Sequence, residues 1–291
     1  MIYYDEKLKI YHEEKDGKAA VTDADKNITE VIIPREINNI PIVNIKKKAF
    51  LGCKQLRSIS LPETVKNVGE WAFAFCDSLS EVKLASNRAV FGQGVFKNDA
   101  RLEKLWIEGI SEASARMLAA AVTVMDAEYL LDTGEAGSSE WIRKWDQKLE
   151  NILNLADDEG YHLYVLCGEE DLHFDYDEYL EYNRRKKAGL SMLRLLYDEE
   201  LKEPLRERLI DYIREHSVGK ESEAAWSCIV DRHGDDIAYY ELMTRLSGID
   251  EDNLEKALNS LSDRHAEAKS FLINHFNKGN KTDEFFDSLM I

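Results

Sequence analysis

A repeat with a period of about 23 positions governs the first third of the sequence, and this is a length typical of repeat proteins. Leu56, Leu79 and Leu102 are equally spaced at this period. Two further sets of apolar residues keep the same spacing, namely Phe50, Phe73 and Phe96, and Ile45, Val68 and Phe91. One such unit cannot bury its apolar face alone, so units of this kind stack on one another. The repeat therefore predicts a short solenoid at the start of the chain.

Each unit contains a short strand. Residues 56–62 alternate apolar and polar side chains, which predicts a strand with one buried face. Residues 79–85 and 102–108 repeat this pattern, and residues 28–34 anticipate it. The step from Ile28 to Leu56 is longer than the repeat, and residues 37–41 are the expected insertion.

Alternation along these strands assigns their two sides. The side chains expected to point inward are apolar: Ile59, Leu61, Val82, Leu84, Leu105 and Ile107. Solenoids bind partners on extended sheet faces, so the side chains expected to face solvent are candidate partner-binding residues. They are Glu30, Ile32, Ser58, Ser60, Glu81, Lys83, Lys104 and Trp106.

Trp106 is the candidate of greatest interest on this face. A tryptophan is costly to leave in water and is a favoured hot-spot residue in interfaces. The alternative is that a helix beginning near Ser111 packs over it.

The two ends of the repeat also carry signals. Residues 7–11 and 18–22 are candidate strands joined by a turn at 15–17, which predicts a hairpin that caps the open end of the solenoid. Cys53 and Cys76 occupy equivalent repeat positions and are expected to stack in the core, with Asp99 at the third such position.

The repeat units resemble a known family. The strings Ile-Thr-Glu-Val-Ile-Ile-Pro, Ala-Phe-Leu-Gly-Cys-Lys-Gln-Leu and Ser-Leu-Pro-Glu-Thr-Val-Lys-Asn-Val-Gly-Glu-Trp-Ala-Phe are similar to BspA-type leucine-rich repeats over roughly residues 20–110. The resemblance implies a right-handed solenoid with a parallel sheet on one face, in bacterial proteins often linked to adhesion or protein binding. Surface members of that family often carry many more units than the three or four present in this chain.

Helical periodicity replaces the repeat after residue 110. Residues 133–139 form a turn-rich linker in which Ser139 is the expected N-cap. Trp141, Trp145, Leu149 and Ile152 then define one face of an amphipathic helix. The other helices are expected at 115–131, 176–197, 204–216, 221–232, 235–246, 251–262 and 266–277.

A weaker and longer repeat lies in the last helices. Asp231-Arg232-His233 recurs as Asp263-Arg264-His265, which resembles degenerate ankyrin-like helical pairing over residues 204–277. The expected fold class is therefore α+β. A leucine-rich-repeat solenoid with an N-terminal hairpin cap (1–110) precedes an all-α helical-repeat domain (111–291).

Charge and cysteine usage limit the possible partners. The net charge is −18, yet residues 1–110 carry 17 basic and 16 acidic side chains, so the excess lies in the helical half. That sign disfavours nucleic acid and anionic membranes as partners. Residues 1–6 do not resemble a secretory signal, which predicts a cytoplasmic protein; the alternative is an exported protein whose signal lies upstream of Met1.

Motifs of catalysis are scarce. The sequence holds no phosphate-binding glycine loop, nucleophile elbow or His-Glu-x-x-His, so no catalytic residue and no cofactor is assigned. The densest group of potential ligands is Glu169, Glu170, Asp171 and His173, near His162 and Cys167, but its spacing is not that of a zinc finger and no metal is assigned.

Three functions are compatible with these observations. The favoured one is a non-catalytic protein-protein interaction or scaffolding module with a protein partner. The first alternative is a metal-dependent hydrolase-like enzyme with its site in the helical half. The second is a cell-surface adhesin, if an export signal precedes the sequence.

Overall fold

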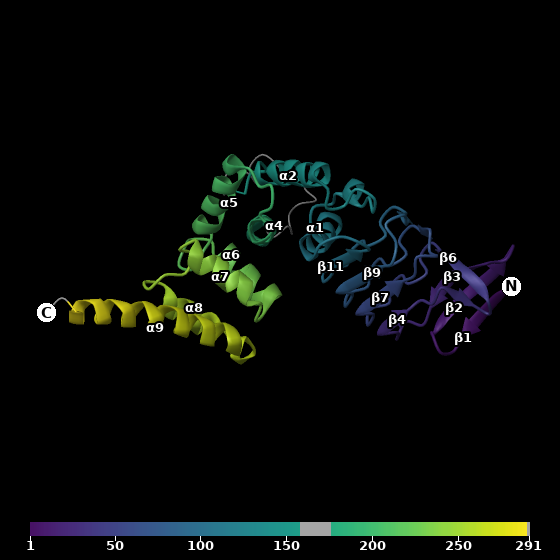
Figure 1. Cartoon of the computed structure of the whole chain (residues 1–291), viewed down its shortest axis with the longest axis horizontal. Coiled ribbons are helices and arrows are strands. Elements are labelled where there is room, and N and C mark those ends of the chain that lie inside the picture. The colour runs from purple at the N-terminus through teal and green to yellow at the C-terminus, as the bar shows by residue number, and fades with distance from the viewer. Residues whose placement is uncertain (158–175, 290–291) are drawn as a thin grey trace. The chain divides into compact units, whose positions relative to one another are not determined.

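The computed structural model describes residues 1–157 and 176–289 (Figure 1). The chain divides into two compact units, Met1–Ile152 and Leu153–Ile291. The first contains a β-solenoid and the second is helical, which confirms the predicted α+β class. The boundary expected between residues 110 and 111 stays a prediction about domain organisation.

Three antiparallel strands open the first unit: β1 (Ile2–Asp5), β2 (Ile10–Lys15) and β3 (Lys18–Ala24). The capping hairpin is β2 and β3, with its turn at the expected place. The strand expected at residues 7–11 is wrong, because the chain turns before Ile10. The Asp5 carboxylate accepts a hydrogen bond from the Leu8 backbone N–H at 2.8 Å, which favours that local turn over a strand.

A second hairpin forms at the insertion of residues 37–41. The strands β5 (Glu36–Ile37) and β6 (Ile40–Ile45) pair antiparallel. Between them Asn38 and Asn39 have φ of 53° and 61°, the left-handed backbone that a two-residue hairpin turn requires. Because β6 also pairs in parallel with β3, the hairpin cap continues into the solenoid.

Two rows of parallel strands form the solenoid (Figure 1). The first is a four-stranded sheet in the order β11-β9-β7-β4, made of β4 (Glu30–Ile32), β7 (Ser58–Leu61), β9 (Glu81–Leu84) and β11 (Lys104–Ile107). The second consists of β6, β8 (Asn67–Val68) and β10 (Val90–Phe91). All four repeat strands lie within the residue ranges that the alternation predicts.

The solenoid core follows the repeat registers. Phe50, Phe73 and Phe96 stack through successive coils, with ring centroids 5.3 and 5.6 Å apart. Cys53 and Cys76 are buried free thiols. Burial is also found for every strand side chain expected to point inward: Ile59, Leu61, Val82, Leu84, Leu105 and Ile107.

Helices complete the first unit. The helix α1 (Glu112–Thr123) begins at the N-cap Ser111 and contacts β11. The helix expected over 115–131 ends earlier than its apolar pattern suggests. The backbone N–H groups of Val124 and Met125 both bond to the Ala120 carbonyl, and the chain then turns at Asp126 with φ of 51°. A 3₁₀ turn, η1 (Glu128–Leu130), follows.

The helix α2 (Ser139–Leu153) carries the predicted aromatic face. Trp141 and Trp145 are buried, and their indole N–H groups donate to the carbonyls of Leu130 (2.8 Å) and Met117 (3.0 Å). The residue that caps this helix is Ser138 rather than Ser139, because the Ser138 hydroxyl accepts from the Trp141 N–H at 3.2 Å.

The second unit is built of helices and short helical turns. These are α4 (Tyr176–Leu196), α5 (Glu203–Glu215), α6 (Ala224–Cys228), η3 (Ile229–His233), α7 (Ile237–Arg245), α8 (Leu254–Ser260), η4 (Asp263–His265) and α9 (Ala266–Leu289). The helix expected at 221–232 begins at Ala224 and widens into the π-helical turn η3.

The ankyrin-like repeat of residues 204–277 is not confirmed. The two Asp-Arg-His triplets lie in different kinds of turn, a π-helical turn at 231–233 and a 3₁₀ turn at 263–265. The side chain of His265 is buried and contacts the Ser262 cap and the Val230 carbonyl, whereas His233 stacks on Tyr239. The same three residues therefore have different structural roles in the two places.

Candidate binding surface

The predicted partner-binding residues lie in two rows across the four-stranded sheet. The four strands pair in parallel with no register shift, so residues at equivalent positions of neighbouring strands lie side by side. The first row is Glu30, Ser58, Glu81 and Lys104; the second row is Ile32, Ser60, Lys83 and Trp106. We call these eight residues the sheet face. None of the eight is buried.

Large apolar side chains stand at both ends of the second row. Ile32 is 74% exposed and lies on β4, the edge strand of the sheet. Trp106 lies on β11 at the opposite edge and is half-buried. Between them are the hydroxyl of Ser60 and the ammonium group of Lys83. The row thus presents two apolar ends and a polar centre.

The Trp106 ring is fixed by its neighbours. Its indole N–H donates to the Glu81 carboxylate at 2.8 Å, and the Lys104 ammonium group lies 5.8 Å from the ring centroid. Lys104 in turn forms an ion pair of 2.7 Å with Glu112, the first residue of α1. The alternative, that the helix beginning near Ser111 packs over Trp106, is thus not decided by this ion pair: α1 contacts β11, and Trp106 stays half-buried.

Acidic side chains on and beside the sheet face are held ionised. Burial raises the pKa of Glu81, but hydrogen bonds from Lys83 and Trp106 outweigh it, and the pKa lies below its ordinary value. The pKa of Glu112 is also lowered, chiefly by the hydrogen bond from Lys104 and then by the one from Arg116. Sequence reasoning missed Glu112 and Arg116, because the position of α1 against β11 is a tertiary property.

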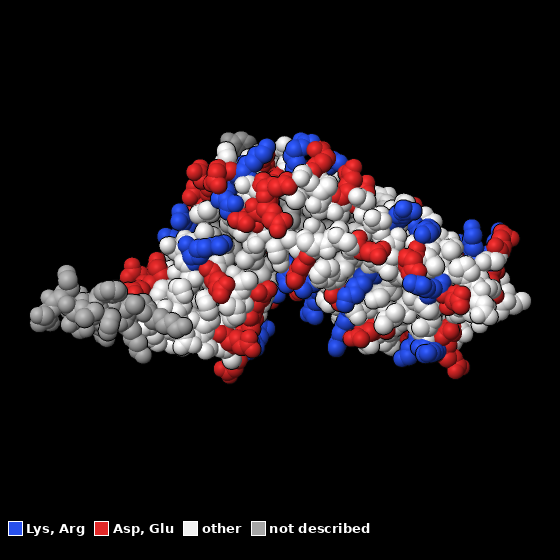
Figure 2. Space-filling view, viewed as in Figure 1, with Lys and Arg blue, Asp and Glu red and all other residues white. Residues whose placement is uncertain are grey.

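Charge on the solenoid is mixed and locally paired. Figure 2 shows basic and acidic side chains interspersed over the solenoid surface that it presents. The sheet face itself has two acidic residues, Glu30 and Glu81, and two basic ones, Lys83 and Lys104. A neutral face of this kind does not select a partner by bulk charge.

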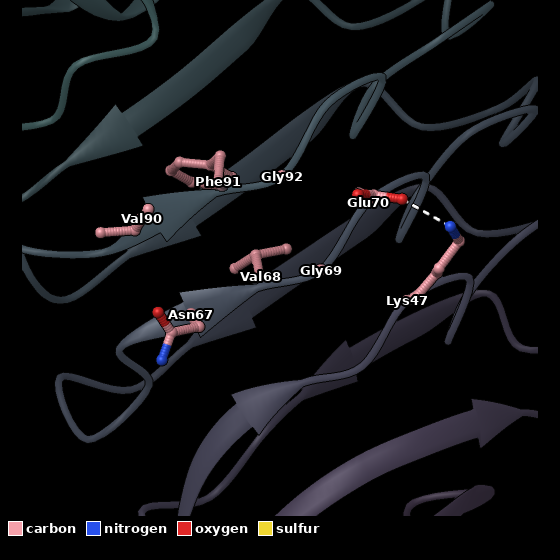
Figure 3. A pocket seen from close by; sticks show the side chains of 8 residues that line it. All are labelled: Lys47, Asn67, Val68, Gly69, Glu70, Val90, Phe91 and Gly92. Atoms are coloured by element: carbon pink, nitrogen blue, oxygen red, sulfur yellow. Dashed lines mark hydrogen bonds and ion pairs between the residues drawn. The ribbon is translucent and has the colours of Figure 1, made fainter.

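A shallow depression of about 430 Å³ lies on the other strand row, beside β8 and β10 (Figure 3). Its rim carries the ion pair of Lys47 and Glu70, at 2.5 Å. Its floor includes Gly69 and Gly92, where a Cβ would approach the backbone of the preceding coil to 2.4 Å. The depression follows from close coil stacking, and its open form provides no enclosed ligand site.

The sequence over residues 23–124 matches the BspA type Leucine rich repeat region, in 6 copies. These residues form a BspA-type leucine-rich repeat region. The predicted resemblance is thus confirmed for the first third of the chain. A comparison with curated proteins finds no match.

Several solved structures of bacterial proteins are similar to part of this chain. They include a leucine-rich repeat protein of T. pallidum (22% identity, TM-score 0.33, 38% of this chain and 51% of that one) and a leucine-rich cell surface protein of Faecalibacterium prausnitzii (26%, 0.32, 35% and 29%). A third is a leucine-rich repeat protein of Bacteroides capillosus (24%, 0.30, 37% and 99%). The match therefore spans about half or less of the first two proteins.

Later in the sequence, the helical unit contains a polar cluster around a buried lysine. Lys187, on α4, is 3% exposed at its side chain and pairs with the Asp157 carboxylate at 2.9 Å. The Tyr212 hydroxyl donates to the same carboxylate at 2.7 Å. The neighbouring Arg185 pairs with Asp231. Arg185 and Lys187 of the basic run 184–187 are therefore each paired with an acidic side chain.

The potential metal ligands of the helical half lie outside the described residues. These are His162, Cys167, Glu169, Glu170, Asp171 and His173. Within residues 1–157 and 176–289, no group of three or more His, Cys, Asp or Glu side chains is arranged to hold a metal ion. In the same residues no helix combines the length and the apolar character needed to cross a bilayer.

Proposed function

We propose that this chain is a non-catalytic protein-interaction or scaffolding module that binds a protein partner through the sheet face. The observation that supports it is the open outer side of the sheet, with Ile32 and Trp106 at opposite ends of one row. Exposed apolar side chains of this size on a rigid scaffold are the usual anchors of an interface.

The geometry of the row suggests the form of the partner. Ile32 and Trp106 are separated by three strand spacings of about 4.8 Å, roughly 14 Å in all. The side chains between them offer one hydroxyl and one cation. A suitable partner segment carries two apolar side chains about that far apart, with hydrogen-bond acceptors between them.

The first experiment identifies the partner and then measures its affinity. The intact chain is used for affinity purification from the source organism, and the recovered protein is produced and titrated against purified variants. Trp106→Ala is expected to weaken binding at least tenfold, and Lys83→Glu to weaken it several-fold.

Matched controls lie elsewhere on the same unit. Tyr129→Ala removes an aromatic side chain that is exposed but lies in η1, and Lys66→Glu reverses an exposed charge outside the sheet face. Both are expected to bind as the wild type does. If Trp106→Ala and Lys83→Glu bind as tightly as the controls, the sheet face is not the binding surface.

The proposal also includes the absence of turnover chemistry and of a bound metal. Elemental analysis of the purified chain addresses the ligand-rich residues Glu169, Glu170, Asp171 and His173 directly. A stoichiometric transition metal that is lost in His173→Ala would contradict the non-catalytic assignment and favour the metal-dependent enzyme.

The proposed location is the cytoplasm. Fractionation of the source organism, with detection of the native protein, tests this part separately. Recovery from the cell surface or the medium would instead favour the adhesin.

A further inference from the structure

A second surface of the solenoid is distinguished by backbone angles that recur from coil to coil. After each strand of the second row, two residues of the coil adopt left-handed backbone angles. They are Lys48 and Gly52 (62° and 69°), then Trp71 and Phe75 (57° and 61°), then Gly94 and Asn98 (64° and 64°). These positions recur with the period of the sequence repeat, so the geometry belongs to the coil and not to its side chains.

The middle coil fills both positions with large aromatic residues. Glycine and asparagine adopt this conformation most easily, whereas a bulky side chain there is unfavourable by about 1–2 kcal/mol. Burial does not compensate in the usual way, because Trp71 and Phe75 are each 38% exposed. The coil geometry therefore accounts for the backbone angles at these positions but not for the choice of large aromatic residues there.

The neighbouring coil accommodates the indole. A Cβ at Gly94 would lie 3.1 Å from Trp71 Nε1, so the glycine leaves room for the ring to lie against the backbone. The rings of Trp71 and Phe75 have centroids 6.3 Å apart and planes inclined by 33°. They form an adjacent aromatic pair on the segment between β8 and β9, apart from the sheet face.

The polar groups around the pair are already engaged. Lys47 pairs with Glu70, Lys97 with Asp126 at 4.0 Å, and the Glu128 carboxylate accepts from the Gly94 N–H at 2.9 Å. Among the described residues, no group accepts a hydrogen bond from the Trp71 indole N–H. The pair therefore offers two ring faces and one donor, and the charged groups named beside it are already engaged.

We propose that Trp71 and Phe75 bind a proline-rich peptide segment in the polyproline II conformation. Such a segment has no internal hydrogen bonds, so its carbonyl groups are free to accept from the indole N–H. Its prolyl rings are uncharged and apolar and dock on aromatic side chains. An oligosaccharide also stacks on aromatic rings, but its many hydroxyl groups need several polar partners, and the charged side chains flanking the pair are engaged with one another.

Nuclear magnetic resonance of the full chain tests this assignment. The chain has five tryptophans, so its ¹H–¹⁵N spectrum contains five indole signals, and Trp71→Asn identifies the signal of Trp71. Titration with an acetylated decaproline peptide is expected to shift that signal saturably and to leave the other four in place. A glycine-serine peptide of equal length is expected to shift none.

Variants distinguish binding from structure. Phe75→Asn and Trp71→Asn introduce the residue type already found at position 98, so the fold is expected to persist, as circular dichroism and melting will show. Phe75→Asn is expected to weaken decaproline binding at least tenfold, whereas Lys48→Asn, at the position equivalent to Trp71 in the preceding coil, leaves it unchanged. Trp71→Phe keeps a ring but removes the donor and is expected to weaken binding to a smaller extent.

The outcomes separate this proposal from the sheet-face function. Trp106→Ala is expected to bind decaproline normally, so either surface can fail without the other. The proposal is overturned if decaproline leaves the Trp71 signal in place, or if Phe75→Asn binds the peptide as the wild type does. A shift caused by cellohexaose but not by decaproline would assign the pair to glycan binding instead.

Discussion

Asp99 stands where the two preceding coils carry Cys53 and Cys76. Its side chain is 1% exposed, and one carboxylate oxygen accepts from the Cys76 N–H at 2.8 Å while the other has no partner within the described residues. Burial raises the pKa of Asp99 to about 8 despite that hydrogen bond. Burial also raises the pKa of the Cys53 thiol to about 11 and that of Cys76 further, so both thiols are unreactive at neutral pH.

The raised pKa of Asp99 makes the stability of the fold depend on pH. The folded state holds the proton up to about pH 8, whereas the unfolded chain releases it near its ordinary value of 3.8. The free energy of unfolding therefore falls as pH rises from about 4 to 8, on the order of a few kcal/mol. Asp99→Asn keeps the acceptor for Cys76 and is expected to remove this slope, as urea unfolding at pH 5 and pH 8 will show.

Asp16→Asn is the matched control for that measurement, because Asp16 is exposed and is not among the groups that shift the pKa of Asp99. It is expected to retain the wild-type slope between pH 5 and 8. Equal slopes for Asp99→Asn and the wild type would show that the Asp99 carboxyl is ionised in the fold.

The ion pairs of Lys187 and Arg185, both on α4, differ in how much they contribute to the stability of the helical unit. Lys187→Met leaves the Asp157 carboxylate without its buried cation and is expected to destabilise the helical unit by about 3–5 kcal/mol. Arg185→Met breaks a more exposed pair with Asp231 and is expected to cost about 1 kcal/mol or less. Urea midpoints of the two variants give the comparison, and similar losses would refute the distinction.

At the scale of elements, close stacking of the coils depends on glycine. Gly69→Ala would place a Cβ 2.4 Å from the Lys47 backbone nitrogen, which forces two coils apart and is expected to destabilise the solenoid by about 3 kcal/mol or more. Gly109→Ala meets no atom within 4 Å and strains only a left-handed backbone, at about 1 kcal/mol. Thermal unfolding ranks the two, and a Gly109→Ala loss as large as that of Gly69→Ala would contradict the stacking argument.

The elements that could be predicted are those whose pattern is local and repeated. The alternation in residues 56–62 predicts β7 and both of its sides, and the spacing of Trp141 and Trp145 predicts the buried face of α2. The end of α1 could not be predicted, because Met125 and Ala127 remain buried after the helix stops and so continue the apolar pattern. The start of β2 depends on a side-chain hydrogen bond from Leu8 N–H to Asp5 that periodicity does not register.

The candidate site, too, could be predicted from the sequence only in its locally patterned part. Alternation places the eight residues of the sheet face on the solvent side of the strands. It does not show that Glu81 and Lys104 hold Trp106 between neighbouring coils, because that depends on the register of β9 against β11. The left-handed conformation of Trp71 and Phe75 could have been suspected from the glycines and asparagine at equivalent repeat positions, Gly52, Gly94 and Asn98.

At the scale of the whole molecule, two compact units share one chain with an uneven charge. The first unit does not end with the last repeat strand. The Thr133 hydroxyl donates to the Ala89 carbonyl at 3.1 Å, and Glu128 accepts from the Gly94 N–H at 2.9 Å. The acidic excess, by contrast, begins after residue 110. Charge and packing thus divide the chain at different places.

Truncated chains test whether the solenoid folds stably when it ends at the charge boundary, residue 110, or only when it ends at the packing boundary, residue 152. Residues 1–152 keep α1 and all of α2 except its last residue, and are expected to unfold in a single cooperative transition. Residues 1–110 lose the helix that contacts β11 and uncover apolar side chains at the end of the solenoid, so this fragment is expected to aggregate or to melt well below the longer one. Calorimetry and size-exclusion chromatography compare the two. Equal melting temperatures would place the folding boundary at residue 110, because the two following helices would then contribute nothing to the stability of the solenoid.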